Sequence, residues 1–151
     1  MLREQINGKL KEAMKAKDSN VVGTLRLIMA ALKDRDIAAR STGNCDGVGE
    51  EDILGLLQSM IKQRRDSIEM YNKGDRADLA DAEQAEIAII EQFLPQQMND
   101  EEIDAAVDAA IAKTGAESIK DMGKVMGVLK GDHAGEMDFG KASGVVKAKL
   151  T

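Results

Sequence analysis

The stretch Ile87-Ala88-Ile89-Ile90-Glu91-Gln92-Phe93-Leu94-Pro95 decides how this chain is divided. Its apolar residues follow a helical spacing, and it ends at the only proline of the chain. Proline lacks an amide hydrogen and disfavours helical backbone at the preceding residue, so a helix must stop near Leu94. We therefore predict a domain boundary at this point, with residues 1–95 and 96–151 as the two domains.

On the N-terminal side of this boundary, apolar residues recur every three to four positions, which is the period of an amphipathic helix. Four helices are predicted: residues 2–17, from a cap at Asp18, Ser19 or Asn20 to about Arg40, from Glu50 to Gly74, and from a cap at Asp75 to about Leu94. The buried stripe of the first helix is expected to consist of Leu2, Ile6, Leu10 and Met14.

On the C-terminal side, the same period predicts three shorter helices. Asn99 followed by Glu102 has the spacing of a capping box, and Gly115 is suited to end the helix that follows. Ser118 with Asp121 is expected to start the next helix, and Asp138 is expected to cap the last one.

The composition agrees with a helical protein. Apolar residues make up 43% of the chain and aromatic residues only 2%, so the core must be built from aliphatic side chains and methionine. The expected fold class is all-α, with an N-terminal helical bundle of about four helices followed by a smaller C-terminal three-helix tail. No apolar stretch approaches the roughly 18 residues of a membrane span, and Met1-Leu2-Arg3-Glu4 does not resemble a signal peptide, so we expect a cytoplasmic protein.

No motif of enzymatic chemistry stands out. The glycine-rich loop of residues 43–49 lacks the GK[ST] ending of a phosphate-binding loop and does not follow a predicted strand. Cys45 and His133 are each the only residue of their kind, and they lie in different predicted domains. Metal-binding sequences such as H-E-x-x-H or paired C-x-x-C are absent. We therefore predict no catalytic residue, no metal site and no cofactor.

The charge of the chain is unevenly distributed. The net charge of −6 argues against avid, non-specific binding of nucleic acid. Residues 1–40, however, hold nine basic and five acidic residues, and residues 118–151 hold six and four. The segment 75–117 holds two basic residues and twelve acidic ones. Both ends are therefore basic, and the middle is acidic.

Phosphate contacts are expected at the basic ends and at the basic run in the middle of the third predicted helix, because Lys and Arg side chains bind the nucleic-acid backbone. The nucleic-acid-binding candidates are Lys120, Lys124, Lys130, Lys141, Lys147, Arg26, Arg64 and Arg65. The alternative for the lysines is a solubilising surface, and for Arg64 and Arg65 it is pairing with Glu83 and Glu86 of the next helix. With so few aromatic residues, RNA recognition would use backbone and shape.

Several stretches together resemble the YqeY family: Thr24-Leu25-Arg26-Leu27-Ile28, Lys62-Gln63-Arg64-Arg65 with Ser67-Ile68 and Tyr71, and Ile89 to Pro95. The stretch Met122-Gly123-Lys124-Val125-Met126-Gly127, followed by Gly135, Met137-Asp138 and Ala142-Ser143, resembles the tail domain shared with the GatB component of the tRNA-dependent aspartyl/glutamyl amidotransferase.

This resemblance implies a tRNA-binding accessory module, whose partner is tRNA or a tRNA-handling enzyme. In the amidotransferase, the tail contacts tRNA while other domains and subunits perform the chemistry, and this chain resembles only the tail and its helical neighbour. Two alternatives remain open. One is a protein-interaction adaptor that uses the acidic residues 75–104, and the other is a carbon–nitrogen ligase with glutamine as amido donor, for which the sequence offers no nucleotide-binding loop and no convincing nucleophile.

Overall fold

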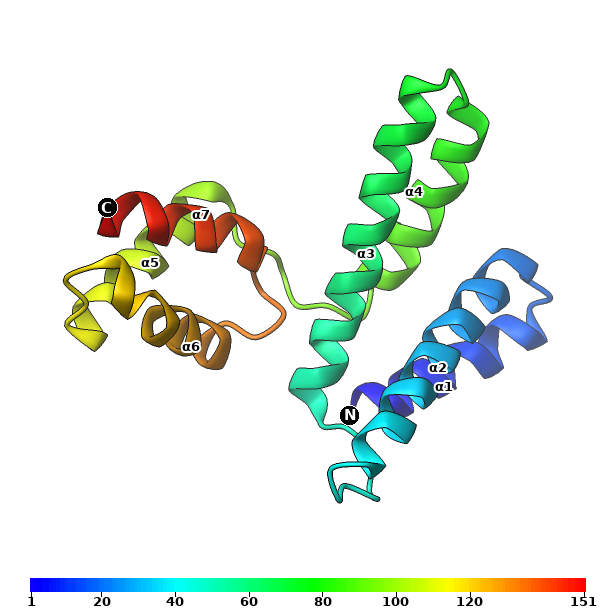
Figure 1. The fold of residues 1–151 in the computed structure, drawn as a ribbon. Helices are drawn as coiled ribbons and strands as arrows, with labels where there is room; N and C mark the ends of the chain where they lie inside the picture. Colours follow the sequence, from blue (N-terminus) through cyan, green and yellow to red (C-terminus); the bar gives the residue numbers. More distant parts are fainter. The chain divides into compact units, whose positions relative to one another are not determined.

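Every regular element of the computed structural model, which describes residues 1–151, is a helix (Figure 1). The predicted all-α class is confirmed. The chain divides into two compact units, Met1–Pro95 and Gln96–Thr151. Unit 1 contains α1 (Leu2–Lys15), α2 (Ser19–Arg40), α3 (Glu50–Lys73) and α4 (Ala77–Glu91). Unit 2 contains α5 (Asp100–Thr114), the short 3-10 helix η1 (Ile119–Asp121), α6 (Met122–Asp132) and α7 (Phe139–Leu150).

Unit 1 consists of two antiparallel helical hairpins, α1 with α2 and α3 with α4. The hairpins meet where α2 contacts α3 and α4, and they diverge toward their connecting turns (Figure 1). Aliphatic side chains fill the region where the hairpins meet, and several of them are fully shielded from water, among them Leu25, Ile28, Leu57 and Ile90. None of the helices contains a hydrophobic stretch of the length that a membrane span requires.

The joint between α1 and α2 is very short. Lys17 adopts the left-handed conformation with φ of 57°, and the amide of Asp18 donates to the Ala13 carbonyl at 3.0 Å. The Asp18 carboxylate accepts from the amide of Val21 at 3.3 Å, so one residue closes α1 and caps α2. The cap at Asp18 is confirmed. The predicted end of the first helix at residue 17 is wrong, because a left-handed residue cannot continue a right-handed helix.

The buried stripe of α1 also departs from the prediction. Leu2 and Ile6 are buried, but Met14 is 52% exposed and Ala13 is buried in its place. A helix has 3.6 residues per turn, so residues spaced by four advance about 40° around the axis at each step. After three steps the side chain of Met14 has left the core-facing side.

The turn between α3 and α4 contains a second left-handed residue. The amide of Arg76 donates to the Tyr71 carbonyl at 2.8 Å across Asp75, whose φ is 55°. Asp75 therefore terminates α3 together with Gly74 and does not cap α4, which corrects the predicted cap. At its C-terminal end α4 stops at Glu91, and the chain continues to Leu94 in turns. In these turns the amides of Phe93 and Leu94 each donate to the carbonyl three residues earlier.

The loop of residues 41–49 is held by charged side chains. The Arg3 guanidinium binds Asp36 on α2, with Nη1 2.8 Å from Oδ2, and it donates to the Val48 carbonyl at 3.0 Å. The amide of Val48 donates to Asp36 Oδ1 at 2.9 Å. The Arg3 hydrogen bond, followed by that of Val48, lowers the pKa of Asp36 to about 2 from its ordinary value of 3.8.

The three helices of unit 2 pack around a core that includes Val107, Val125, Met137 and Val146. The predicted caps are present. Asn99 and Glu102 form a capping box with two bonds of 2.8 Å, Gly115 ends α5 with φ of 67°, and Asp138 accepts from the amide of Gly140 at 2.9 Å. The Asp121 carboxylate accepts from the amides of Glu117 and Ser118.

Candidate nucleic-acid interface

The charges of unit 2 are divided between its helices. Five acidic residues lie on α5, namely Asp100, Glu101, Glu102, Asp104 and Asp108, whereas α7 carries three lysines and no acid. Two of these lysines bind α5. Lys149 Nζ lies 2.6 Å from Asp108 Oδ1 and 3.0 Å from Asp104 Oδ1, and Lys141 Nζ lies 3.4 Å from Asp100 Oδ1. The hydrogen bonds to Asp108 and then Asp104 raise the pKa of Lys149.

The other candidate lysines of this region form no ion pair. They are Lys120 on η1, Lys124 and Lys130 on α6, and Lys147 on α7, and all four are exposed. Lys124 contributes a weak attraction to Asp121, whose pKa is lowered mainly by the amide hydrogen bonds of Glu117 and Ser118. The predicted tail lysines therefore fall into two groups. Lys141 is tied to α5, and the other four carry positive charge that the fold does not neutralise.

Glycines accompany these free lysines on the outer faces of α6 and α7. On α6 they recur every fourth residue, as Gly123, Gly127 and Gly131, and on α7 they are Gly140 and Gly144. All five are exposed, and a Cβ added at any of the three on α6 would meet no atom within 4 Å. Sequence reasoning missed this arrangement, although the four-residue spacing of the glycines was the signal that would have revealed it.

The predicted arginines all lie in unit 1, and their surroundings differ. Arg64 is only 12% exposed, and its Nε lies 2.8 Å from Glu86 and 4.0 Å from Glu83. The pairing alternative is therefore the arrangement observed for Arg64. Arg65 makes an exposed ion pair with Glu91 at 3.6 Å, and Arg26 is exposed on α2 without an ion pair.

The acidic middle segment, residues 75–104, is largely engaged within the chain. Glu83, Glu86 and Glu91 pair with the arginines of α3, Asp78 pairs with Arg76, and the α5 aspartates pair with lysines of α7. The side chains left without a partner are Asp75, Asp81 and Glu101. The segment therefore offers few free carboxylates for a basic partner.

The residues considered for catalysis lie in simple surroundings. Cys45 is exposed in the loop of unit 1, whereas His133 belongs to unit 2, where its Nδ1 lies 3.1 Å from Glu136 Oε2. The His133–Glu136 pair is a local contact within one turn of the chain. No group of three or more His, Cys, Asp or Glu residues is arranged to hold a metal ion.

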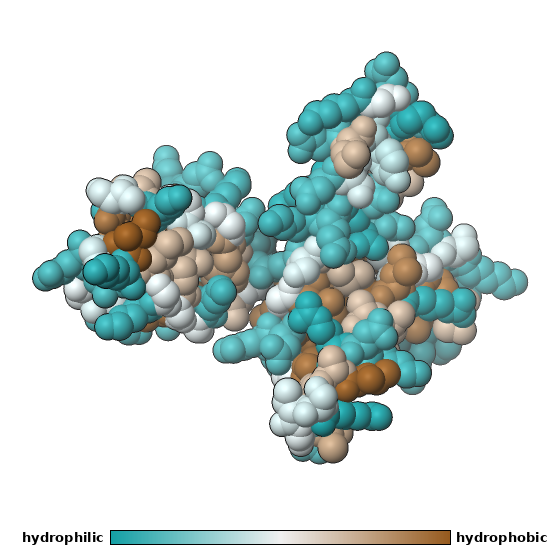
Figure 2. Space-filling model, viewed as in Figure 1, coloured by the Kyte–Doolittle hydropathy of each residue, from teal (hydrophilic) through white to brown (hydrophobic).

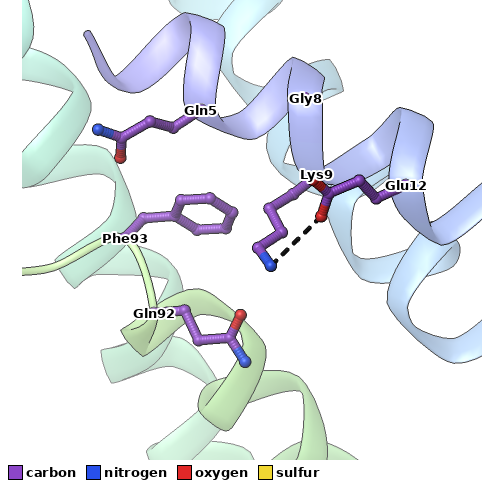
Figure 3. A pocket seen from close by; sticks show the side chains of 6 residues that line it. All are labelled: Gln5, Gly8, Lys9, Glu12, Gln92 and Phe93. Atoms are coloured by element: carbon purple, nitrogen blue, oxygen red, sulfur yellow. Dashed lines mark ion pairs between the residues drawn. The ribbon is translucent and has the colours of Figure 1, made fainter.

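A shallow pocket of about 380 Å³ lies in unit 1 between one face of α1 and the end of α4 (Figure 3). Its lining consists of Gln5, Gly8, Lys9, Glu12, Gln92 and Phe93. The Phe93 ring projects toward α1, and Lys9 pairs with Glu12 at 3.5 Å on the rim (Figure 3). The pocket combines one aromatic surface with amides and a neutralised ion pair, so it offers no strong charge to a ligand.

A family model described as Yqey-like protein matches residues 3–150, nearly the whole chain. The chain belongs to the YqeY family. The free lysines of α6 and α7 and the arginines of α3 all lie within the matched range.

Fungal relatives of this YqeY-family chain cover parts of it. An uncharacterized protein of Schizosaccharomyces pombe is 30% identical over 95 residues, which are 63% of this chain and 73% of the relative. The protein named altered inheritance of mitochondria protein 41, mitochondrial, is 37% identical over 100 residues in Lachancea thermotolerans and 29% identical over 130 residues in a Saccharomyces cerevisiae strain. These alignments cover 65% and 82% of this chain and 51% and 68% of the relatives, so the chain spans about half the length of the Lachancea protein. Because two of these relatives are named as mitochondrial, a cytoplasmic location stays a prediction.

Proposed function

We propose that this YqeY-family chain binds structured RNA, with tRNA as the first candidate, through the outer faces of α6 and α7, and that it performs no bond chemistry on its own. The observation that carries the proposal is the set of four exposed lysines without ion pairs, Lys120, Lys124, Lys130 and Lys147, on η1, α6 and α7. The resemblance of this unit to the amidotransferase tail supports tRNA as the ligand.

The chemistry of this surface suits a sugar-phosphate backbone. Lysine ammonium groups neutralise phosphates and release counterions, which supplies affinity without reading the base sequence. The glycines beside these lysines leave the backbone of the protein helix uncovered. The sugar-phosphate backbone of an RNA can therefore approach the helix without displacing side chains. The chain has no tryptophan, two phenylalanines and one tyrosine, which argues for recognition by shape and not by base stacking.

The proposal is tested by measuring tRNA binding as a function of salt concentration. The test variant changes Lys120, Lys124, Lys130 and Lys147 to Ala. The matched control changes Lys9, Lys73, Lys113 and Lys141 to Ala, which removes the same charge from lysines that are exposed but already ion-paired. Each lost phosphate contact should reduce the slope of log affinity against log salt by about 0.7 to 0.9. For the four lysines of the test variant we expect the slope to fall by up to about 3.6, and for the control by much less.

Two outcomes would contradict the proposal. Equal loss in both variants would mean that only net charge matters and that no surface is specific. Absence of tRNA binding by the intact chain at low salt would remove direct RNA binding and leave a tRNA-handling enzyme as the expected partner.

A further inference from the structure

The outward face of α2 carries aliphatic side chains that do not pack in the core. On the core side of this helix, Leu25, Ile28 and Leu32 are buried. On the opposite side, Leu27 is 48% exposed and Ile37 is 50% exposed. Gly23 and Ala30 are exposed in the same row, with spacings of three, four and seven residues that place all four on one helix face. Asp34 is also exposed in this row, between Ala30 and Ile37, and is its one charged residue. Figure 2 shows hydrophobic side chains at the surface of the α1–α2 hairpin, surrounded by hydrophilic ones.

Cations follow one edge of this row. Arg26, Lys33 and Arg40 are spaced by seven residues, so they line up along the helix, and all three are exposed. Arg26 and Lys33 form no ion pair, and Arg40 interacts only weakly with Asp36. This face combines a row of small and aliphatic residues with a cationic edge at heptad spacing. Such a pattern is typical of a helix surface against which a second helix packs.

We propose that the outward face of α2 docks an amphipathic helix of a partner protein, and that this helix carries acidic residues along one edge. The two aliphatic side chains provide apolar anchors, and Gly23 and Ala30 allow the helices to approach closely. The acidic edge of the partner complements the row Arg26, Lys33 and Arg40. RNA fits this face less well, because the apolar side chains of Leu27 and Ile37 offer nothing to a phosphate and no aromatic side chain is present for stacking.

The probe for this proposal is a labelled synthetic helical peptide of three identical heptads, with a Leu and Ala row and Glu at the flanking positions. Its binding to the intact chain is followed by fluorescence anisotropy, and an otherwise identical peptide with Lys in place of Glu serves as the charge control. We expect the Glu peptide to bind at least about tenfold more tightly than the Lys peptide, with an affinity that falls as salt rises.

Variants of the chain locate the binding. Leu27→Ala with Ile37→Ala should lower the affinity for the Glu peptide by about tenfold, because these two side chains are the apolar anchors. Arg26→Ala with Lys33→Ala should weaken it by about fivefold and reduce its salt dependence. The matched controls are Met70→Ala and Lys62→Ala, exposed residues of α3 that should leave binding unchanged. Circular dichroism verifies that every variant remains helical.

Three results would overturn the proposal: no binding of the Glu peptide, equal binding of both peptides, or displacement of the peptide by tRNA, which would assign the face to RNA. The variant that changes Lys120, Lys124, Lys130 and Lys147 to Ala separates this proposal from the proposed function. It should keep peptide binding while losing tRNA, so either conclusion can fail without the other.

Discussion

The ion-paired arginines of unit 1 and the unpaired lysines of unit 2 are used in opposite ways. On the α3–α4 hairpin, Arg64 is 12% exposed and held by Glu83 and Glu86 of the neighbouring helix. Arg3 is likewise held by Asp36. On η1, α6 and α7, four lysines are exposed and make no ion pair. The first group stabilises the fold, and the second is available to a ligand.

The helix that lies opposite explains this difference. α3 packs along α4, whose acids face the arginines, whereas α6 and α7 carry no run of acids and only one edge of α7 reaches the aspartates of α5. The position of a basic residue in the sequence therefore does not show whether it is free to bind a ligand, because this depends on the acids of the helix packed opposite. Substitutions of Arg64 and Asp36 test the held charges, and a substitution of Gly127 tests the surface beside the free ones.

The largest effect is expected for Arg64→Ala. The substitution removes the bond from Nε to Glu86 and the bond from Nη1 to the Met60 carbonyl, and it leaves two partly buried carboxylates without a partner. We expect the free energy of unfolding to fall by about 2 kcal/mol, less than for a fully buried pair. Denaturant titration measures the change. Arg65→Ala, in an exposed pair, should cost less than about 0.5 kcal/mol. Loss of tRNA affinity by a folded Arg64→Ala chain would place Arg64 in the free group instead.

A smaller effect is expected for the Arg3–Asp36 pair, and it should depend on pH. The pKa of Asp36 is about 2 in the folded chain, below its ordinary value of 3.8. The pair therefore stabilises the fold fully above about pH 4, and this contribution is lost as the pH falls toward 2. Because both side chains are partly exposed, we expect about 1 kcal/mol. Asp36→Asn should lower the free energy of unfolding by this amount at pH 7, and the difference from the unchanged protein should shrink on acidification. A difference that is constant down to pH 2 would contradict the pairing.

An effect on stability of the opposite sign, no larger than that of Asp36→Asn, is expected for Gly127→Ala. Gly127 is exposed within α6, and a Cβ there meets no atom within 4 Å. Alanine should raise the free energy of unfolding by up to about 1 kcal/mol, because glycine is a poor helix former. If RNA approaches this face closely, the same substitution should weaken tRNA binding. Gly8→Ala on α1 is the control, with similar stabilisation and unchanged binding. A more stable variant with unchanged tRNA affinity would remove the glycines from the interface.

Local sequence signals predicted the helices well. Asp18, Asn99 with Glu102, and Asp138 act on amides two or three residues away, so their roles are visible in a short window of sequence. Lys17 and Asp75 were missed because left-handed backbone is usually assigned to glycine, and here a lysine and an aspartate adopt it.

The candidate site was less predictable. Lys147 and Lys149 are two residues apart on one helix, but only Lys149 reaches Asp108, which lies 41 residues earlier in the chain. Which lysine stays free is decided by the rotation of α7 against α5, and periodicity alone does not specify that rotation. Arg64 posed the same difficulty, since its pairing depends on how α4 is placed along α3.

The double role of Asp18 limits how the chain can change in length. One residue added between Lys17 and Ser19 would separate the amide that closes α1 from the carboxylate that caps α2, so that a single residue could no longer do both. Insertions and deletions should therefore be excluded from this joint and accumulate among the exposed residues 41–46, which lie outside every helix.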